Sequence, residues 1–566
     1  MSYIFALCFT LPLIHLLHSV FSLIKNFQKA QSMGFPVVWS PISPYNPVWI
    51  LFNKRISPIL LKLPFNLGDW TKHNALDWTW TDRVNGSHVH RKYGKTFARA
   101  TPRGVEVYTI DATVSRQILS RGRDFIKPGK YAKILDIYGP TVLSTNGEDW
   151  QRHRKITAAT FSNATNRLVW AESIRQTRQM VEHHTTSDEP SPGMITTIGS
   201  DLSKLFLHVF TRVALGISYD FHSESEELVP EGHRMSYRDC LHNVLDDITL
   251  LHVVPMSALD LPWLPKKLAD LRDSSRELLS YMTEIVNSCR ADSSLGRPMV
   301  NNLLTTMLQK NEEMSRDTSG LAKRRLYLTD GEMYGNMFVY TFGGHESSAH
   351  TLSFAIYLLA AFPDVQSWLA EELQEIDVTV ETTHDELLPR MTRTMAVMYE
   401  TLRLFPVTPV LPKTTGLNSA TIQCNGLDRV LPPGTSVYVN MPTIQVDPDI
   451  WGPDAHLWKP ARWIKPSASA QRGSSGEEFI GATEGSFLVW GEGQRVCPGK
   501  RFSQVAFAAA LATILSRHRI EVMPRENESF EEARQRTWEV VNDTFAVVTI
   551  KMRDPGSVVF RMIPNS

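Results

Sequence analysis

The sequence of 566 residues has a mass of 64.1 kDa and carries 59 Lys plus Arg against 59 Asp plus Glu. A chain of this length can bury a large core, and its balanced charge gives no indication of nucleic-acid binding. Its five cysteines, Cys8, Cys240, Cys289, Cys424 and Cys497, lack CxxC or CxH spacing. This pattern argues against a disulfide framework and a structural zinc site, and it fits a reducing compartment.

The first predicted element is an apolar segment at residues 4–24. About 20 apolar residues are enough for a helix that spans a bilayer. Lys25 and Lys29 follow directly, so the positive-inside rule places the rest of the chain on the cytosolic side. A cleaved signal peptide is the competing interpretation, but the basic start and small-residue cleavage site that it needs are missing. We therefore predict a single-pass anchor at residues 1–24.

A proline-rich connector is predicted at residues 25–76. The prolines of "GFPVVWSPISPYNPVW" are incompatible with a regular helix or a central strand. The apolar patch "ISPILLKLPF" comes next, and it either lies on a membrane surface or forms an ordinary loop. No domain boundary stands out from residue 77 to residue 566, so this segment is predicted to be one domain.

The segment 77–566 is predicted to be mainly α-helical with small β-sheets. Strand-like alternation is limited to "TFARATPRGVEVYTI", "TSVYVNM" and "DTFAVVTIKM". The clearest helix starts with a capping box of Thr329 and Glu332 and ends before Pro363. Such a helix is about 45 Å long, enough to cross a domain.

The middle of this helix reads "FGGHESSAH", which is poor helix chemistry. Gly343 and Gly344 cost about 1 kcal/mol each relative to alanine. They serve either a close crossing with another helix or a distortion over a ligand, with Glu346 and Ser347 supplying polar groups there. The segment alone leaves both interpretations open.

Two further segments combine charge with apolar surroundings. In "VMYETLRLFP", Glu400 and Arg403 share a helix face and form either a solvated pair or a buried one, for which Arg462 of "WKPARW" is a further partner. In "GEDWQRHRK", Trp150 and Arg154 suit a bound carboxylate or phosphate, or else belong to an exposed basic helix start.

The segment "LVWGEGQRVCPGKRF" places Cys497 in a glycine-rich turn before a helical pattern. A nucleophile, a metal ligand, a redox thiol or a small residue in a tight turn would each explain a cysteine there. Gly493 and Gly499 allow the backbone to approach the sulfur, and the helix that follows favours a thiolate. Arg495 can pair with an acidic group of the same cofactor. Haem, which has two propionates and accepts an axial cysteine thiolate, fits this pattern.

Together these segments resemble the cytochrome P-450 monooxygenases, across nearly all of the chain behind the apolar N-terminus. The family's pattern Phe-x-x-Gly-x-Arg-x-Cys-x-Gly is matched from Trp490 to Gly499, with tryptophan in place of phenylalanine. The family's Glu-x-x-Arg, Pro-x-Arg-Phe/Trp and Trp-x-x-x-Arg elements and its oxygen-binding segment are matched by the other segments described above. Five elements in the family's order form a very specific signature.

The resemblance implies the cytochrome P-450 fold with haem b, and Cys497 as the axial iron ligand whose thiolate favours O–O cleavage. Glu346 and Ser347 are the implied acid–alcohol pair that relays protons to the reacting oxygen. Ser347 lacks the methyl group of the family's usual threonine, which puts coupling efficiency in doubt. The implied haem contacts are Trp150, Arg154, Gly343, Gly344, Trp490, Gly493, Arg495, Cys497 and Gly499, and the implied structural triad is Glu400, Arg403 and Arg462.

The resemblance also implies electrons from NADPH through a separate NADPH–cytochrome P-450 reductase, because residues 498–566 are too few for a flavin domain. Cytochrome b5 is a further expected partner. We expect the reductase to dock on the cysteine side, near Lys500, Arg501, Arg152 and Lys155. The expected location is the endoplasmic reticulum membrane with a cytosolic catalytic domain, and the motif style is similar to fungal members in secondary metabolism.

The predicted activity is insertion of one atom of O2 into a lipophilic small molecule of terpenoid, polyketide or indole type, with steroids and fatty acids left open. A reductase-independent haem-thiolate isomerase or dehydratase and a non-catalytic haem-binding protein are the alternatives. Retention of Glu346 and Ser347 favours oxygen activation. By family analogy the pocket is lined by residues 131–138, 206–254, 340–344 and 407–411 and the surroundings of Phe545.

Overall fold

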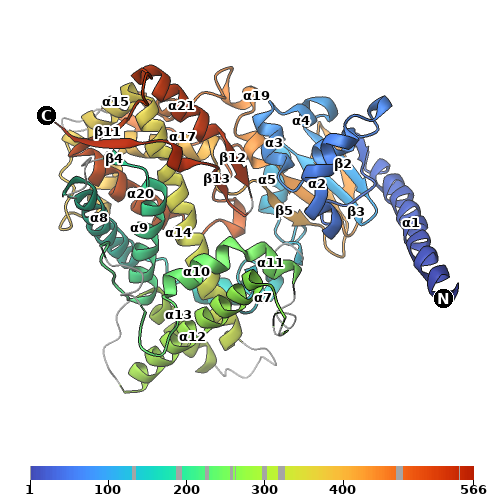
Figure 1. The fold of residues 1–566 in the computed structure, drawn as a ribbon, viewed down its shortest axis with the longest axis horizontal. Helices are drawn as coiled ribbons and strands as arrows, with labels where there is room; N and C mark the ends of the chain where they lie inside the picture. Colours follow the sequence, from blue (N-terminus) through green and yellow to red (C-terminus); the bar gives the residue numbers. More distant parts are fainter. Residues whose placement is uncertain are drawn as a thin grey trace.

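The computed structural model describes residues 2–129, 135–186, 194–222, 229–254, 259, 261, 263–295, 302–316, 326–466, 476–546 and 548–565. Helices form most of this part of the chain, and the strands are short and belong to small sheets. Figure 1 shows a sheet with the first helices on one side and a larger helical body on the other. The predicted mainly α architecture with small β-sheets is confirmed.

The N-terminal region surrounds a five-stranded sheet. Its order is β1 (Val37–Trp39), β2 (Thr96–Thr101), β3 (Gly104–Thr109), β8 (Ser436–Val439) and β5 (Leu411–Thr414). β2 and β3 are antiparallel, whereas β3 and β8 are parallel, so late strands complete a sheet that begins near the N-terminus. The helices of this region are α1 (Ser2–Gln31), α2 (Pro47–Leu60), α3 (Trp78–Val84), α4 (His88–Tyr93) and α5 (Ala112–Ser120).

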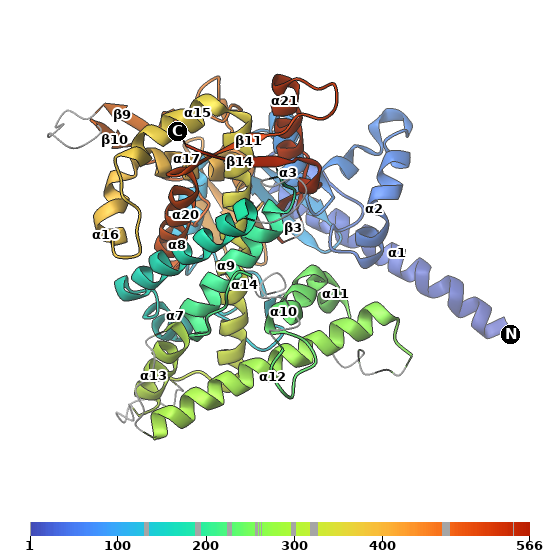
Figure 2. The same ribbon diagram turned by 60° about the vertical axis from the view of Figure 1, so that its left-hand side comes forward.

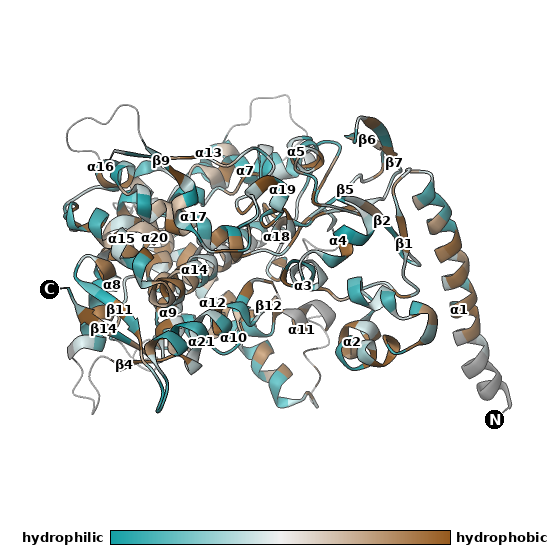
Figure 3. Ribbon diagram, turned by 90° about the horizontal axis from the view of Figure 1, so that it is seen from above, coloured by the Kyte–Doolittle hydropathy of each residue, from teal (hydrophilic) through white to brown (hydrophobic). Residues whose placement is uncertain are grey.

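The predicted anchor at residues 4–24 lies within α1, which extends away from the body toward the N-terminus (Figures 1 and 3). Its other end is fixed to the sheet, where Ala30 is fully buried and Asn26 donates to the carbonyl oxygen of Thr101 at 2.8 Å. Within the described residues, no single helix has both the length and the hydropathy of a membrane span. Only α14 (Asp330–Ala361) and α15 (Pro363–Gln374), bent by 111°, meet that test as a pair. The anchor remains a prediction.

The connector predicted at residues 25–76 contains more regular structure than expected. Residues up to Gln31 continue α1, β1 is an edge strand, and α2 begins at Pro47. The N-cap residue Asn46 accepts hydrogen bonds from the backbone N–H groups of Val48 and Trp49 through Oδ1. Proline at the first helical position loses no hydrogen bond, so Pro47 permits the helix to begin. Pro58 lies inside α2 and has no N–H group for the helix ladder, so the helix tolerates this interior proline.

The helical body is organised around α14, which runs through its middle in both ribbon views (Figures 1 and 2). This helix has 32 residues and is buried along most of its length, and the predicted capping box of Thr329 and Glu332 is present. Its main neighbours are α9 (Ile198–Leu215), α17 (Thr392–Leu404), α20 (Lys500–Leu515) and α21 (Phe530–Asn542). The other helices are α7 (Gly147–Ala158), α8 (Asn163–Thr186), α10 (Tyr237–Asp246), α11 (Ile248–Val253), α12 (Lys266–Ser294), α13 (Leu303–Arg316), α16 (His384–Leu387), α18 (Met441–Ile444) and α19 (Pro448–Trp451).

Small sheets complete the fold. One has the order β11 (His518–Val522), β14 (Phe560–Pro564) and β4 (Met194–Ile195). The two-stranded sheets pair β6 (Ala420–Cys424) with β7 (Leu427–Leu431), β9 (Ile464–Pro466) with β10 (Glu477–Phe479), and β12 (Thr544–Ala546) with β13 (Ile550–Met552). All three segments with strand-like alternation form strands. The strands that were not predicted are β1, β4, β5, β6, β7, β9, β10, β11 and β14.

Candidate active site

Cys497 lies in a turn between the short 3-10 helix Gly493–Arg495 and α20. Its backbone N–H donates to the carbonyl oxygen of Trp490 at 2.7 Å. The Cys497 side chain is exposed on one side. Protein nevertheless surrounds it closely enough that burial raises the pKa of the thiol, against the opposing hydrogen bond from the Gly499 N–H. A side chain with both properties lines an internal hollow.

The two glycines of the turn have different reasons to be glycine. Gly493 has a φ of +69°, and a Cβ there would lie 2.7 Å from the carbonyl oxygen of Leu119 at the end of α5. A Cβ at Gly499 would make an ordinary contact of 3.8 Å with the Cys497 sulfur. The predicted close approach to the sulfur therefore involves Gly499, while Gly493 brings the turn against α5.

The Trp490 ring belongs to an aromatic layer beside this turn. Its Nε1 donates to the Ser503 hydroxyl at 3.2 Å, and its centroid lies 5.2 Å from that of Tyr399 and 5.8 Å from that of Phe487. The Lys500 ammonium lies 5.2 Å from the same ring. Trp490 thus supports the turn through both its backbone carbonyl group and its ring.

Helix α7 brings Trp150 and Arg154 to the cysteine turn. Arg154 donates from Nη2 to the carbonyl oxygen of Val496 at 3.2 Å. The Arg495 guanidinium lies 4.7 Å from the Trp150 ring centroid and donates to Asn146 Oδ1 at 2.9 Å. Two segments far apart in the sequence therefore assemble one cationic cluster next to the sulfur.

Two lysines that the sequence analysis missed, the buried Lys413 and the partly exposed Lys127, extend this cluster. Burial lowers the pKa of Lys413 to about 7 and that of Lys127 to about 8, and the neighbouring cations add to both shifts. Burial also lowers the pKa of Arg495 to about 10. In the described residues these three side chains have no ion pair with a carboxylate. Buried cations need anionic partners, so this arrangement is suited to a ligand with acidic groups.

The two glycines of α14 have different surroundings, and only the helix-crossing interpretation of "FGGHESSAH" is confirmed, for Gly344. The distortion over a ligand stays a prediction for Gly343. A Cβ at Gly344 would collide with the ring of Phe210 on α9, so this glycine permits the helix crossing. A Cβ at Gly343 would have no atom within 4 Å. One turn later, the Ser347 hydroxyl donates to the Gly343 carbonyl oxygen at 2.5 Å and is partly accessible. The Gly343–Ser347 face therefore borders open space.

Glu346 and Ser347 have different partners in the structure. The Glu346 Oε1 lies 2.6 Å from the Lys551 ammonium of β13. Its Oε2 is buried and has no hydrogen-bond partner in the described part of the chain. His350, one turn further along α14, is partly buried, and this lowers the pKa of its imidazole to about 4. The structure therefore places the acid toward β13 and the alcohol on the Gly343 carbonyl group.

Glu400, Arg403 and Arg462 form a buried network. Both oxygens of Glu400 accept hydrogen bonds from Arg403, at 2.8 Å each, and Arg462 Nε donates to Oε1 at 2.8 Å. Glu400 Oε2 also accepts from the Trp463 indole at 2.9 Å, while Arg403 donates to the carbonyl oxygen of Ala455 at 2.6 Å. Side chains of Glu400 and Arg403 are 0% exposed, so the pair is buried rather than solvated.

Arg152, predicted to contribute to a docking surface, does not lie on that surface. Its guanidinium binds both carboxylate oxygens of Glu332, at 2.7 and 2.9 Å, and its side chain is only 7% exposed. The reason is that its side of α7 faces the start of α14. Lys155, Lys500 and Arg501 are exposed, as a docking surface would require.

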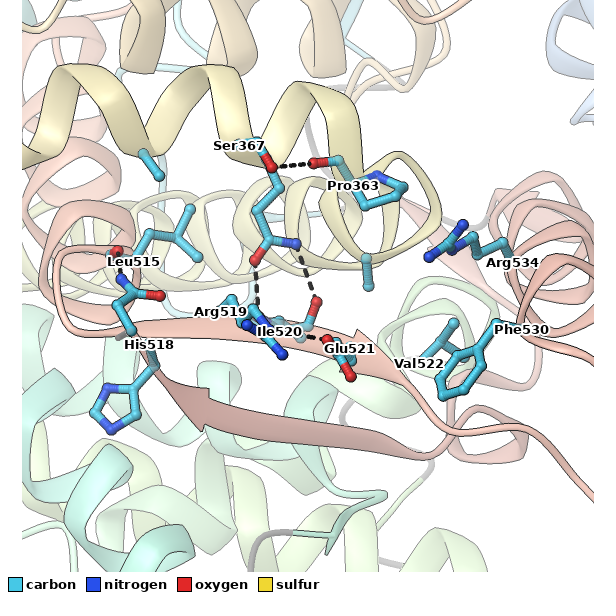
Figure 4. Close-up of a pocket in the computed structure, with 14 residues that line it drawn as sticks. Pro363, Ser367, Leu515, His518, Arg519, Ile520, Glu521, Val522, Phe530 and Arg534 are labelled. Carbon is cyan, nitrogen blue, oxygen red and sulfur yellow. Dashed lines mark hydrogen bonds and ion pairs between the residues drawn. The ribbon is translucent and has the colours of Figure 1, made fainter.

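The pocket in Figure 4 is separate from this site. It lies between α15, the end of α20, β11 and α21, and has a volume of about 150 Å³. Its polar floor is structural, because Gln366 bonds the backbone N–H and C=O groups of Ile520 at 2.7 and 3.0 Å. Ligand pockets usually exceed this volume. Of the segments predicted to line the substrate pocket, residues 131–134 and 223–228 lie outside the described residues.

The comparisons with known proteins agree with the geometry. The sequence profile of the cytochrome P450 family matches residues 78–543. The chain belongs to the cytochrome P450 family. It is 28% identical to a cytochrome P450 monooxygenase of Arthrobotrys oligospora, covering 96% of both chains. It is 27% identical to the cytochrome P450 monooxygenase of the phomenoic acid biosynthesis cluster of Leptosphaeria maculans (93% of both) and 26% identical to the monooxygenase prx9 of Penicillium rubens (90% of both).

The family match, together with relatives that are cytochrome P450 monooxygenases, identifies this protein as a cytochrome P450 monooxygenase, and the family implies a haem-thiolate cofactor. The residues present fit that group. Cys497 supplies an accessible thiol, Lys127, Lys413, Arg154 and Arg495 supply cations for two propionates, and the Gly343 face leaves space opposite.

Proposed function

We propose that this cytochrome P450 is a membrane-bound haem-thiolate monooxygenase that inserts one oxygen atom of O2 into a lipophilic small molecule. Cys497 would hold the haem iron, and Trp150, Arg154, Arg495, Lys127 and Lys413 would hold its propionates. The single observation that carries the proposal is the accessible thiol beside a largely enclosed cationic cluster, in which Lys127, Lys413 and Arg495 have no carboxylate partner in the described residues. When bound, the haem supplies the oxygen-activating chemistry.

The chain's own groups would manage the protons. The Ser347 hydroxyl donates its hydrogen bond to the Gly343 carbonyl oxygen. It can rotate to donate to a ligand in the open space beside Gly343 instead. Glu346, bound to the partly exposed Lys551, offers a path between this helix and solvent. Together the two side chains would deliver protons and limit the entry of bulk water.

The decisive experiment is the reduced, carbon-monoxide-bound spectrum of the purified protein. A thiolate ligand gives the red-shifted Soret band of the family, and Cys497→Ser should lose it while Cys289→Ser, at a partly buried cysteine outside the cluster, should keep it. A Cys497→Ser protein that binds haem with the family band would overturn the assignment.

The electron source proposed is NADPH through a separate NADPH–cytochrome P-450 reductase, with cytochrome b5 as a further donor. Lys155, Lys500 and Arg501 would form its docking surface, because they are exposed and two of them begin the helix that follows Cys497. Charge reversal of Lys500 and Arg501 should raise the KM for the reductase and leave substrate binding unchanged. An unchanged KM would place the docking surface elsewhere.

We also propose the endoplasmic reticulum membrane as the location, with the catalytic domain in the cytosol. Large apolar side chains are exposed on α1 and on the segment that contains α2, which suits contact with lipid. They are Leu13, Ile14, Leu16, Leu17, Val20, Phe21 and Ile24, followed by Val48, Leu51, Phe52, Ile56, Ile59, Leu61, Leu63, Phe65 and Leu67. Membrane fractionation of the full chain and of a chain lacking residues 2–24 tests this location.

A role in fungal secondary metabolism is the proposed biological setting. The similarity to a monooxygenase of the phomenoic acid biosynthesis cluster supports it. A terpenoid, polyketide or indole intermediate fits the proposed lipophilic pocket. Spin-shift screening of the ferric protein against these three classes would identify the class.

A further inference from the structure

A second unpaired cation lies on α3. The Arg83 guanidinium stacks between two buried aromatic side chains, with its Cζ 4.6 Å from the Trp80 ring centroid and 5.3 Å from that of Phe405. No carboxylate pairs with it, and no hydrogen bond engages its side chain, in the described part of the chain. The two rings fix the orientation of the guanidinium and leave its donors unused.

The surroundings of Arg83 are unfavourable for an isolated charge. Burial lowers the pKa of the guanidinium to about 9, although the residue retains partial accessibility. Cys497 shows the same combination of close enclosure and accessibility, which marks a side chain at a hollow. A guanidinium that is largely enclosed by protein and has no acceptor in the described residues is costly, and its partial accessibility leaves room for an anion from outside the chain.

This cation is distinct from those proposed for the haem propionates. Besides burial, only Arg403 acts on the pKa of Arg83. The pKa of Lys413 is instead lowered by Lys127 and Arg495, and that of Lys127 by Arg495. Arg403 is already neutralised by Glu400, so Arg83 is left as the cation without a counter-charge at its own location.

The two rings that flank Arg83, Trp80 and Phe405, contact elements next to the region predicted to bind substrate. The Trp80 indole donates to the Thr544 hydroxyl of β12 at 2.9 Å. Phe405 stacks on Phe354 of α14, with ring centroids 4.7 Å apart. Phe354 lies two turns after Ser347 on the same face of α14, about 10 Å along the helix. Arg83 therefore lies at one end of the region that the proposed function assigns to substrate.

We propose that Arg83 binds the carboxylate of a lipophilic acid substrate, whose chain extends toward the Gly343–Ser347 face. A guanidinium fork matches a carboxylate through two parallel hydrogen bonds. Anchoring the acid at this end directs oxidation to carbon atoms remote from the carboxylate. This inference rests on the proposed function and specifies its substrate class.

The test compares acids with their methyl esters, which have the same chain without the charge. Dissociation constants of dodecanoic and hexadecanoic acid and of both methyl esters are measured by calorimetry on the haem-loaded full chain. The variants are Arg83→Met, which keeps a long apolar side chain, Arg83→Lys, which keeps the charge, and Arg116→Met at an exposed ion pair with Glu484 as the control.

We expect both acids to bind more tightly than their esters, and Arg83→Met to weaken acid binding about ten- to hundredfold without changing ester binding. Arg83→Lys should restore part of the preference, and Arg116→Met should match the wild type. Acids that bind no more tightly than esters, or an Arg83→Met protein that loses both equally, would overturn the inference. Calorimetry does not depend on the iron spectrum, so a failed thiolate assignment would be recognised separately.

Discussion

The Glu346 carboxylate and the Lys551 ammonium, 2.6 Å apart, join the middle of α14 to the β12–β13 hairpin. The Glu346 side chain is 10% exposed and that of Lys551 is 32% exposed, so the pair extends from the core to the solvent. The acid that the family pattern identifies is thus held by a residue about 200 positions away in the sequence, outside every family pattern that the sequence analysis used.

The first prediction is an energetic coupling between these two side chains. Lys551→Met leaves a largely buried carboxylate without its counter-charge and should lower the free energy of unfolding by about 1–2 kcal/mol, less than for a fully buried pair because Lys551 is partly exposed. Glu346→Gln combined with Lys551→Met should lose less than the sum of the single changes. Denaturant unfolding of all four proteins measures this cycle, and additive effects would show that the pair is energetically irrelevant.

The second prediction concerns Ser347 and proton delivery. Ser347→Ala removes the hydroxyl group on the Gly343 carbonyl oxygen and should lower product formed per NADPH while peroxide release rises several-fold. Ser347→Thr keeps the hydroxyl, adds the methyl group that restrains it, and should match or exceed the wild type in coupling. Unchanged turnover and unchanged peroxide leakage in Ser347→Ala would rule out the relay.

The third prediction separates the two glycines of α14. Gly344→Ala places a methyl group against the Phe210 ring and should destabilise the protein by about 1–3 kcal/mol, as overpacking does. Gly343→Ala has free space and a better helix former, so its stability should be unchanged or about 1 kcal/mol higher. Its methyl group should instead weaken binding of bulky substrates in a spin-shift titration. Equal stability of the two variants would contradict the helix crossing.

Local chemistry made part of this structure predictable. The capping box of Thr329 and Glu332, the Glu400–Arg403 spacing and the glycine-rich turn around Cys497 each depend on residues close together in the sequence. Gly343 and Gly344 could not be separated, because neighbours on a helix point about 100° apart and only the tertiary packing decides which one meets Phe210.

Tertiary burial accounts for what the sequence analysis missed. Lys127 and Lys413 stand in ordinary apolar and proline-containing contexts, and nothing local indicates that both lysines reach the Arg495 cluster. Arg152 was assigned to the wrong surface because its partner, Glu332, is far away in the sequence. Positions of charges in space, rather than their order along the chain, decide these roles.

The last prediction uses Lys413, which is 3% exposed and whose pKa burial lowers from 10.5 to about 7 in the haem-free protein. Between pH 7 and about 10 the unfolded chain binds a proton that the folded, haem-free chain does not, so stability rises with pH across this window. Lys413→Met removes the free-energy cost of burying this amine. We expect it to stabilise the haem-free protein by about 2–4 kcal/mol at pH 7 and by less than about 1 kcal/mol near pH 10.

The haem-loaded protein should respond in the opposite direction. The propionates would pair with the Lys413 ammonium, so Lys413→Met should speed haem transfer to excess apomyoglobin about tenfold at pH 7. Lys155→Met, at an exposed lysine outside the cluster, is the matched control and should change neither property. Denaturant unfolding and haem-transfer kinetics supply the two measurements. If Lys413→Met shifts both stability and haem retention in the same direction, this lysine is a packing residue rather than a partner of the cofactor's acid groups.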